Sequence, residues 1–140
     1  MVVSDDHRSP VLDVTLNAPL TLDPKGRVTL PTRIASVLKE RSLIWTPFED
    51  HLWGFLPTTW TGTVVAPLMA EDSWSPGVAD KQRRRLGHAT ELFVDEHGRF
   101  VLTPKLKELA GLSRDCVIVS IVDRLELWDA ARWQAWWDRE

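Results

Sequence analysis

The sequence predicts a strand-rich α+β fold in which two similar modules share one core. The first observation behind this prediction is a repeat: the tract "LDPKGRVTLP" at residues 22–31 has a counterpart, "VDEHGRFVLTP", at residues 94–104. The second is that each tract runs into a short amphipathic segment and later into an apolar, strand-like run. The third is size, because a module of about 40 residues seldom buries enough apolar surface to fold alone.

The repeated unit is Asp-x-x-Gly-Arg. The recurring positions, 72 residues apart, are Asp23, Gly26 and Arg27 in the first copy and Asp95, Gly98 and Arg99 in the second. The aspartate side chain of such a unit can accept a hydrogen bond from a backbone amide two residues on, and glycine adopts a positive φ without penalty. The aspartate and glycine of each copy therefore predict a tight turn.

The same order of elements is expected after each turn. Residues with strand propensity come first, then a proline that suits a helix start, then apolar positions at helical spacing, and finally a second strand. The expected elements are strands at 28–30 and 100–102, helices at 32–38 and 105–112, and strands at 52–56 and 125–128. Gly111 is typical of a helix end.

The modules and the segment between them divide the chain. We expect a first module at 17–61, a linker with a basic helix at 62–89, a second module at 90–133, and the end of a C-terminal helix at 134–140. In the linker, "EDSWSPGVAD" is typical of a loop and "KQRRRLGHA" of a helix. The arginines of this helix (Arg83, Arg84 and Arg85) either contact a DNA backbone or form a solvated face paired with nearby acids.

Composition limits the classes of function. Hydrophobic residues make up 44% of the chain and charged residues 26%, and no apolar run is long enough for a membrane span. The start, "MVVSDDHRSP", lacks the basic patch and apolar core of a secretory leader, so we expect a cytoplasmic protein. Cys116 lies in an apolar run and resembles a small buried hydrophobe.

The chain shows no pattern of catalytic or metal-binding residues. Its histidines have no ligand spacing with each other or with cysteine, and neither a phosphate loop nor a nucleophile elbow is present. These histidines are His7, His51, His88 and His97. We therefore expect no enzyme, no cofactor, no metal and no small-molecule substrate.

The arginine of each repeat is a candidate DNA contact. A rigid turn loses little side-chain entropy when its arginine docks on a bidentate acceptor such as a guanine edge or a phosphate, and Lys25 adds a second cation beside Arg27. The alternative is that Arg27 and Arg99 are solvated or pair with the turn aspartates. The net charge of −3 has the wrong sign for indiscriminate DNA coating, so binding must come from local clusters.

Three tryptophans, Trp133, Trp136 and Trp137, share one face of the expected C-terminal helix, with Asp129 placed to cap its start. Large aromatic side chains in this pattern usually cover the core. The alternative is a contact between subunits, where tryptophan is enriched.

Three segments together resemble the MraZ family of bacterial transcriptional regulators. They are "LDPKGRVTLP", "RRLGHATELFVDEHGRFVLTPKLKELAGL" and "DRLELWDAARW", which occur in the family's order with its intervals. The similarity extends over about residues 17–137. It implies two modules of the AbrB/SpoVT swapped-hairpin type, interleaved as a pseudo-dimer within one chain in a double-psi-like barrel, with several chains closing into a ring.

The resemblance also implies a function. Family members bind short G-rich direct repeats in promoter DNA, notably upstream of the division and cell-wall gene cluster, which implies a cytoplasmic, nucleoid-associated protein. By position, the arginines of the family's motifs are Arg27, with Lys25 beside it, and Arg99; the paired acids are Asp23 and Asp95. A ring would multiply weak contacts through effective concentration and so offset the acidic net charge.

The sequence departs from the family's pattern in several places. His97 stands at the position matching Lys25, Ser120 replaces a glycine expected in the last long strand, the start lacks the family's Phe-x-Gly element, and the linker contains the tract "SWSPG". Two other functions stay open. One is an AbrB-type antitoxin, although a second module stands where its toxin-binding tail would be, and the other is a ring-forming scaffold without DNA binding.

Overall fold

The computed structural model describes residues 16–139, so the longer N-terminal start, His7 and Glu140 lie outside the described residues. The strands are β1 (Leu16–Thr21), β2 (Arg27–Thr29), β3 (Ser42–Phe48), β4 (His51–Phe55), β5 (Thr90–Phe93), β6 (Arg99–Val101), β7 (Asp115–Ile121) and β8 (Arg124–Asp129). The helices are α2 (Thr32–Leu38), α3 (Pro57–Thr59), the π-helix η2 (Trp60–Val65), α4 (Ala66–Ala70), α5 (Val78–Leu86), α6 (Pro104–Leu109) and α7 (Ala130–Asp138). The prediction of a strand-rich α+β fold with short helices is confirmed.

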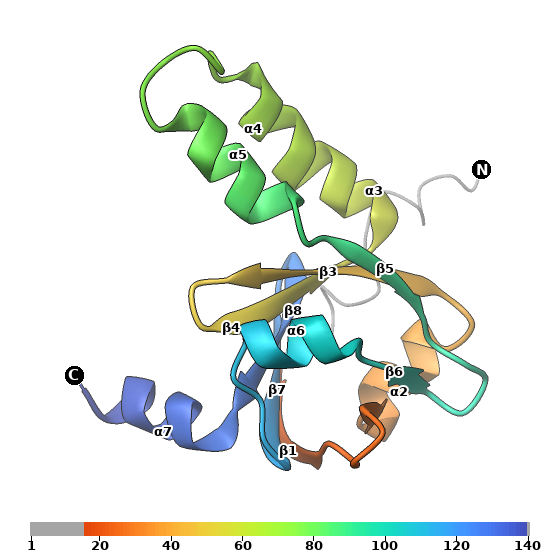
Figure 1. Cartoon of the computed structure of the whole chain (residues 1–140). Coiled ribbons are helices and arrows are strands. Elements are labelled where there is room, and N and C mark those ends of the chain that lie inside the picture. The colour runs from red at the N-terminus through yellow and green to blue at the C-terminus, as the bar shows by residue number, and fades with distance from the viewer. Residues whose placement is uncertain (1–15, 140) are drawn as a thin grey trace.

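The strands of the two halves are interleaved in the larger sheet, where strands of one half pair with strands of the other at three places. All pairings are antiparallel, and they form a six-stranded sheet in the order β1-β7-β8-β4-β3-β5 and a two-stranded sheet of β2 and β6. The first half thus supplies β1 as a neighbour for β7, and the second half supplies β5 as a neighbour for β3 (Figure 1). Between residues 16 and 139 the strands form these two sheets and not one closed barrel.

The shared core lies between the inner faces of the two sheets. Val28 and Phe100 point inward from the two-stranded sheet, and the ring of Phe100 stacks on that of Trp45 with 5.3 Å between centroids. Helices α2 and α6 add Ile34, Leu38 and Leu106 to the same cluster. Because the cluster takes residues from both halves, neither half could bury its apolar face alone.

The linker between the halves contains more helix than the sequence suggests. Residues 57–70 are helical through α3, η2 and α4, and this segment packs beside α5 as a hairpin above the sheet (Figure 1). The sequence predicts only the second helix, because threonine, valine, glycine and proline in the first segment have low helix propensity. The buried side chains of Trp60 and Leu68 stabilise the helical conformation through tertiary packing.

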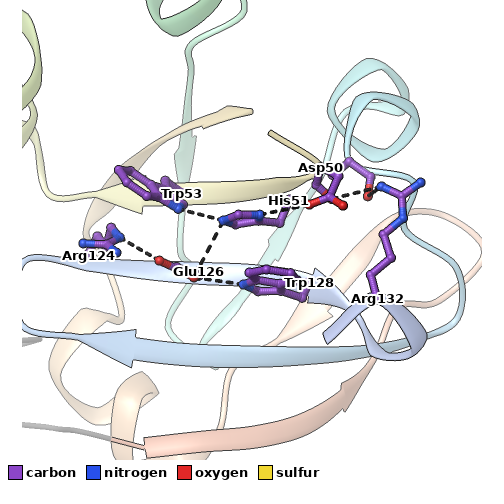
Figure 2. A network of polar contacts seen from close by, with 8 residues as sticks. Asp50, His51, Trp53, Arg124, Glu126, Trp128 and Arg132 are labelled. Carbon is purple, nitrogen blue, oxygen red and sulfur yellow. Dashed lines mark hydrogen bonds and ion pairs between the residues drawn. The ribbon is translucent and has the colours of Figure 1, made fainter. Parts of the chain in front are cut away.

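A polar network on the outer face joins β4 of the first half to β8 of the second (Figure 2). Trp53 Nε1 donates to His51 Nε2 at 2.9 Å, and Trp128 Nε1 donates to Glu126 Oε1 at 2.9 Å. Arg124 Nε donates to Glu126 Oε2 at 2.8 Å, and His51 Nε2 lies 3.7 Å from Glu126 Oε1 across the two strands. His51 and Glu126 are buried, and these contacts satisfy polar atoms that would otherwise be costly to remove from water.

The C-terminal helix α7 packs on the sheet through Trp133, whose ring lies edge-on to Trp128 at 5.4 Å. Trp136 and Trp137 are exposed, so the expectation that the aromatic face covers the core is wrong for these two residues. Asp129 immediately precedes α7, but its carboxylate accepts hydrogen bonds from the Ser113 amide at 3.1 Å and the Ser113 hydroxyl at 2.6 Å. The carboxylate thereby ties the helix start to the preceding loop.

Candidate nucleic-acid interface

The first Asp-x-x-Gly-Arg unit forms a turn held by its own aspartate. Asp23 Oδ1 accepts hydrogen bonds from the amides of Lys25 at 3.0 Å and Arg27 at 2.7 Å. Gly26 has a φ of 86°, and a Cβ placed there would lie 2.7 Å from the carbonyl oxygen of Leu102. The position therefore requires glycine both for its backbone conformation and for the close approach of β6.

The second unit forms the same turn. Asp95 Oδ1 accepts from the amides of His97 at 2.8 Å and Arg99 at 2.9 Å, and Gly98 has a φ of 78°. A Cβ at Gly98 would lie 2.5 Å from the Cβ of Ala35 on α2. Each turn is therefore packed against an element of the other half.

Both aspartates are held in the ionised form. The amide of Arg27 donates to Asp23 and lowers the pKa of its carboxyl group below the ordinary value of 3.8, and the Lys25 amide and the Arg27 guanidinium act in the same direction. The amide of Arg99 lowers the pKa of Asp95 in the same way. Each carboxylate therefore carries the negative charge that stabilises the turn at neutral pH.

The turns lead directly into the two-stranded sheet, which we call the β2–β6 ribbon. Arg27 faces Val101 across the strands, and Thr29 faces Arg99. Because side chains alternate along a strand, these four residues share one face of the ribbon, and Val28 and Phe100 occupy the buried face. The repeat thus places both candidate arginines on one exposed surface.

The aspartates also orient the arginine side chains. Arg27 Nε lies 3.4 Å from Asp23 Oδ2, and Arg99 Nε lies 3.4 Å from Asp95 Oδ2. The two arginine side chains are 46% and 38% exposed. Within residues 16–139, no hydrogen bond uses the terminal nitrogens of either guanidinium group. Each arginine therefore contacts its aspartate through Nε, and its two terminal nitrogens remain available to donate to a bidentate acceptor.

The turn tips differ between the two halves. Lys25 is exposed at the first tip. The second tip carries His97, whose Nε2 lies 3.3 Å from Glu96 Oε2. Glu96 of the second turn occupies the position that Pro24 has in the first turn, so the first tip is the more cationic of the two.

The basic helix α5 lies away from the ribbon. Figure 1 shows α5 beside α4 above the six-stranded sheet, far from β6. Arg83 pairs with Asp80 at 3.1 Å, and Arg85 lies 4.5 Å above the ring of Phe48. Arg84 is exposed. The structure therefore does not bring these arginines together with Arg27 and Arg99.

The exposed ribbon face has two further members, Thr29 and Val101, which were not among the residues predicted for the site. The sequence contains a signal for both residues, because alternation along "RVT" and "RFV" places the first and third residues on the same side.

Among residues 16–139 there is no group of three metal-ligand side chains, and none of the helices there has the length and apolar character to cross a bilayer.

The fold and this surface define a class of protein: an intrachain pair of interleaved modules that presents two turn-fixed arginines on one β-ribbon. A family model described as "MraZ protein, putative antitoxin-like" matches residues 86–140.

Curated relatives match most of the chain. The "Transcriptional regulator MraZ" of Chromobacterium violaceum is 33% identical over 120 residues, which cover 83% of this chain and 80% of the relative. The protein of the same name from Mycolicibacterium gilvum is 34% identical over 114 residues, covering 81% and 78%. That from Shewanella denitrificans is 30% identical over 119 residues, covering 82% and 78%. The chain belongs to the MraZ family.

Proposed function

We propose that this protein is a sequence-specific, double-stranded DNA-binding transcriptional regulator. The observation that carries the proposal is the β2–β6 ribbon, which holds Arg27 and Arg99 on one exposed face with their terminal nitrogens unused by residues 16–139. The names of the relatives support it. Arg27 and Arg99 are the principal contacts and Lys25 assists at the first turn tip.

The ribbon suits the major groove of DNA. This groove, about 12 Å wide, admits a two-stranded β-ribbon, and arginine binds the O6 and N7 atoms of guanine through two hydrogen bonds. The ion pair with each aspartate fixes the guanidinium at Nε and leaves the bidentate edge outward. Arg83, Arg84 and Arg85 lie too far from the ribbon to join the same base contacts, and we assign them to phosphates at the edge of a longer site.

We extend the proposal to finer features that the family resemblance suggests. We propose that the two halves are swapped-hairpin modules at 17–61 and 90–133, and that several chains close into a ring. Each ring would contact short G-rich direct repeats in promoter DNA of the division and cell-wall cluster, including its own promoter, in the cytoplasm at the nucleoid. Several ribbons on successive repeats would give avidity despite a net charge of −3. No catalysis, metal or cofactor takes part.

The test is binding to duplexes selected from a random library, measured by fluorescence anisotropy at several salt concentrations. Arg27→Ala and Arg99→Ala should each reduce specific binding by about fivefold to 150-fold, because a bidentate contact to guanine is worth about 1–3 kcal/mol. Arg139→Ala, on the exposed end of α7, removes the same charge away from the ribbon and should bind as the parent protein does. Unchanged far-UV circular dichroism and an unchanged sedimentation coefficient would show that fold and assembly are intact.

The same experiment separates the regulator from the scaffold. A folded, assembled protein that selects no sequence would contradict the proposal and favour a ring-forming interaction protein. Selective binding that survives both arginine substitutions would place the DNA surface elsewhere on the molecule.

A further inference from the structure

The ribbon carries one exposed apolar side chain, and we propose that it is part of the DNA contact. Val101 would recognise the methyl group of a thymine in the major groove, at the base pair next to the one that Arg27 contacts. This inference rests on the proposed function and names a specificity-determining residue for it.

The position of Val101 is the first observation. Its neighbours Phe100 and Leu102 are buried, whereas Val101 is 55% exposed. It points to the same side as both arginines, and it therefore adds nothing to the core beneath the ribbon. Isolated exposed valines are common on protein surfaces, so exposure alone assigns Val101 no role.

The spacing across the ribbon is the second observation. Gly26 and Leu102 form a hydrogen-bonded pair, with the Leu102 amide donating to the Gly26 carbonyl at 2.8 Å. The next pair, Arg27 and Val101, is therefore a non-hydrogen-bonded pair, in which the Cα atoms are about 4.5 Å apart. Successive nucleotides along a DNA strand rise by about 3.4 Å. When Arg27 contacts a guanine, Val101 thus reaches the adjacent base pair.

The chemistry of the groove selects the partner atom. The thymine C5-methyl group is the apolar feature among the donors and acceptors of the major groove, and valine offers only methyl groups in return. Contact between the methyl groups removes apolar surface of both partners from water. Burial of one carbon atom raises the binding affinity about fourfold. Arg99 lies diagonally from Arg27, about 7–8 Å away, so the ribbon covers about three base pairs.

The two strands of the ribbon have equivalent backbone positions but carry different side chains. The position equivalent to Val101 in the first half is Thr29, which faces Arg99 as Val101 faces Arg27. Threonine offers a hydroxyl group that valine lacks. The turn tips differ too, since the first carries Lys25 and the second His97. The two ends of the ribbon are therefore distinct, and the ribbon recognises a sequence in one orientation only.

The experiment uses the full-length protein and its selected duplex. Each thymine of the duplex is replaced in turn by deoxyuridine, which removes only the methyl group. For the parent protein we expect a loss of about fourfold in affinity at one thymine adjacent to a guanine. With Val101→Ala, the thymine and uracil duplexes should bind equally at that position. Val122→Ala, at a valine that is 63% exposed outside the ribbon, should keep the difference.

Two results would overturn the inference. One is that no single thymine methyl group affects binding, and the other is that the methyl effect remains in full in Val101→Ala. In either case specific binding persists and the proposed function stands. If no duplex is selected at all, the proposed function fails and this inference fails with it. Thermal melts of both valine variants check that the fold is unchanged.

Discussion

Replacement of Gly26 by alanine tests the close approach of the two halves at the first turn. Gly26 has a φ of 86°, a conformation that L-residues adopt only at a cost. The new Cβ would also stand 2.7 Å from the Leu102 carbonyl oxygen, which belongs to the rigid backbone after β6 and cannot rotate away. The ribbon must therefore open at this point.

The cost has two parts. The left-handed conformation costs about 1–2 kcal/mol for an alanine. Opening the ribbon weakens the hydrogen bond from the Leu102 amide to the Gly26 carbonyl, 2.8 Å long, which adds about 1 kcal/mol. The sum is about 2–3 kcal/mol, which corresponds to a fall in melting temperature of about 6–12 °C for a chain of this size.

Gly77 provides the matched control. It has a φ of 82°, close to that of Gly26, but a Cβ there would meet nothing within 4 Å. Gly77→Ala should therefore cost only the conformational part, about 1–2 kcal/mol. Both variants are compared with the parent by thermal and urea unfolding at one fixed protein concentration, since assembly affects apparent stability. Equal losses for Gly26→Ala and Gly77→Ala would refute the argument from close approach.

Two further predictions concern titratable groups. Because the pKa values of Asp23 and Asp95 are lowered in the folded state, the stabilisation they provide is complete above their ordinary value of 3.8 and is lost as the pH falls through the lowered folded values. The double variant Asp23→Asn, Asp95→Asn should thus lose less unfolding free energy between pH 5 and pH 2 than the parent, as measured by urea titration; parallel losses would contradict this. Burial, aided by the charges of Asp129 and Asp115, raises the pKa of Cys116 to about 11. Only about a thousandth of this thiol is ionised at pH 8, so a thiol reagent should react with the protein only in denaturant, and rapid labelling of the folded chain would show that the site is open.

The repeated turns could be predicted because they depend on local contacts. Asp23 bonds amides two and four residues away, and Asp95 does the same, so the information needed lies within five successive residues. The short helices that follow, α2 and α6, begin within one residue and end within three residues of the positions that proline, apolar spacing and Gly111 indicate. The division into two similar halves could be recognised for the same reason.

Tertiary contacts decided the rest of the molecule. The helix at residues 57–70 forms against local propensity because Trp60 and Leu68 are buried. The contact between His51 and Glu126 joins strands that are 73 residues apart, and no spacing rule for metal or catalytic sites would find it. The sequence favoured core packing for Trp136 and Trp137, and only the structure shows that both are exposed, since the helical pattern is the same in both cases.

The sequence by itself determined where the chain turns and which residues each turn presents, because a carboxylate bonded to nearby amides and a glycine with positive φ specify that geometry without help from the rest of the chain. Only the tertiary structure decided that the two strands following the turns pair with each other. The pairing of β2 with β6 depends on a core assembled from both halves, and it places Arg27, Arg99, Thr29 and Val101 on a single surface.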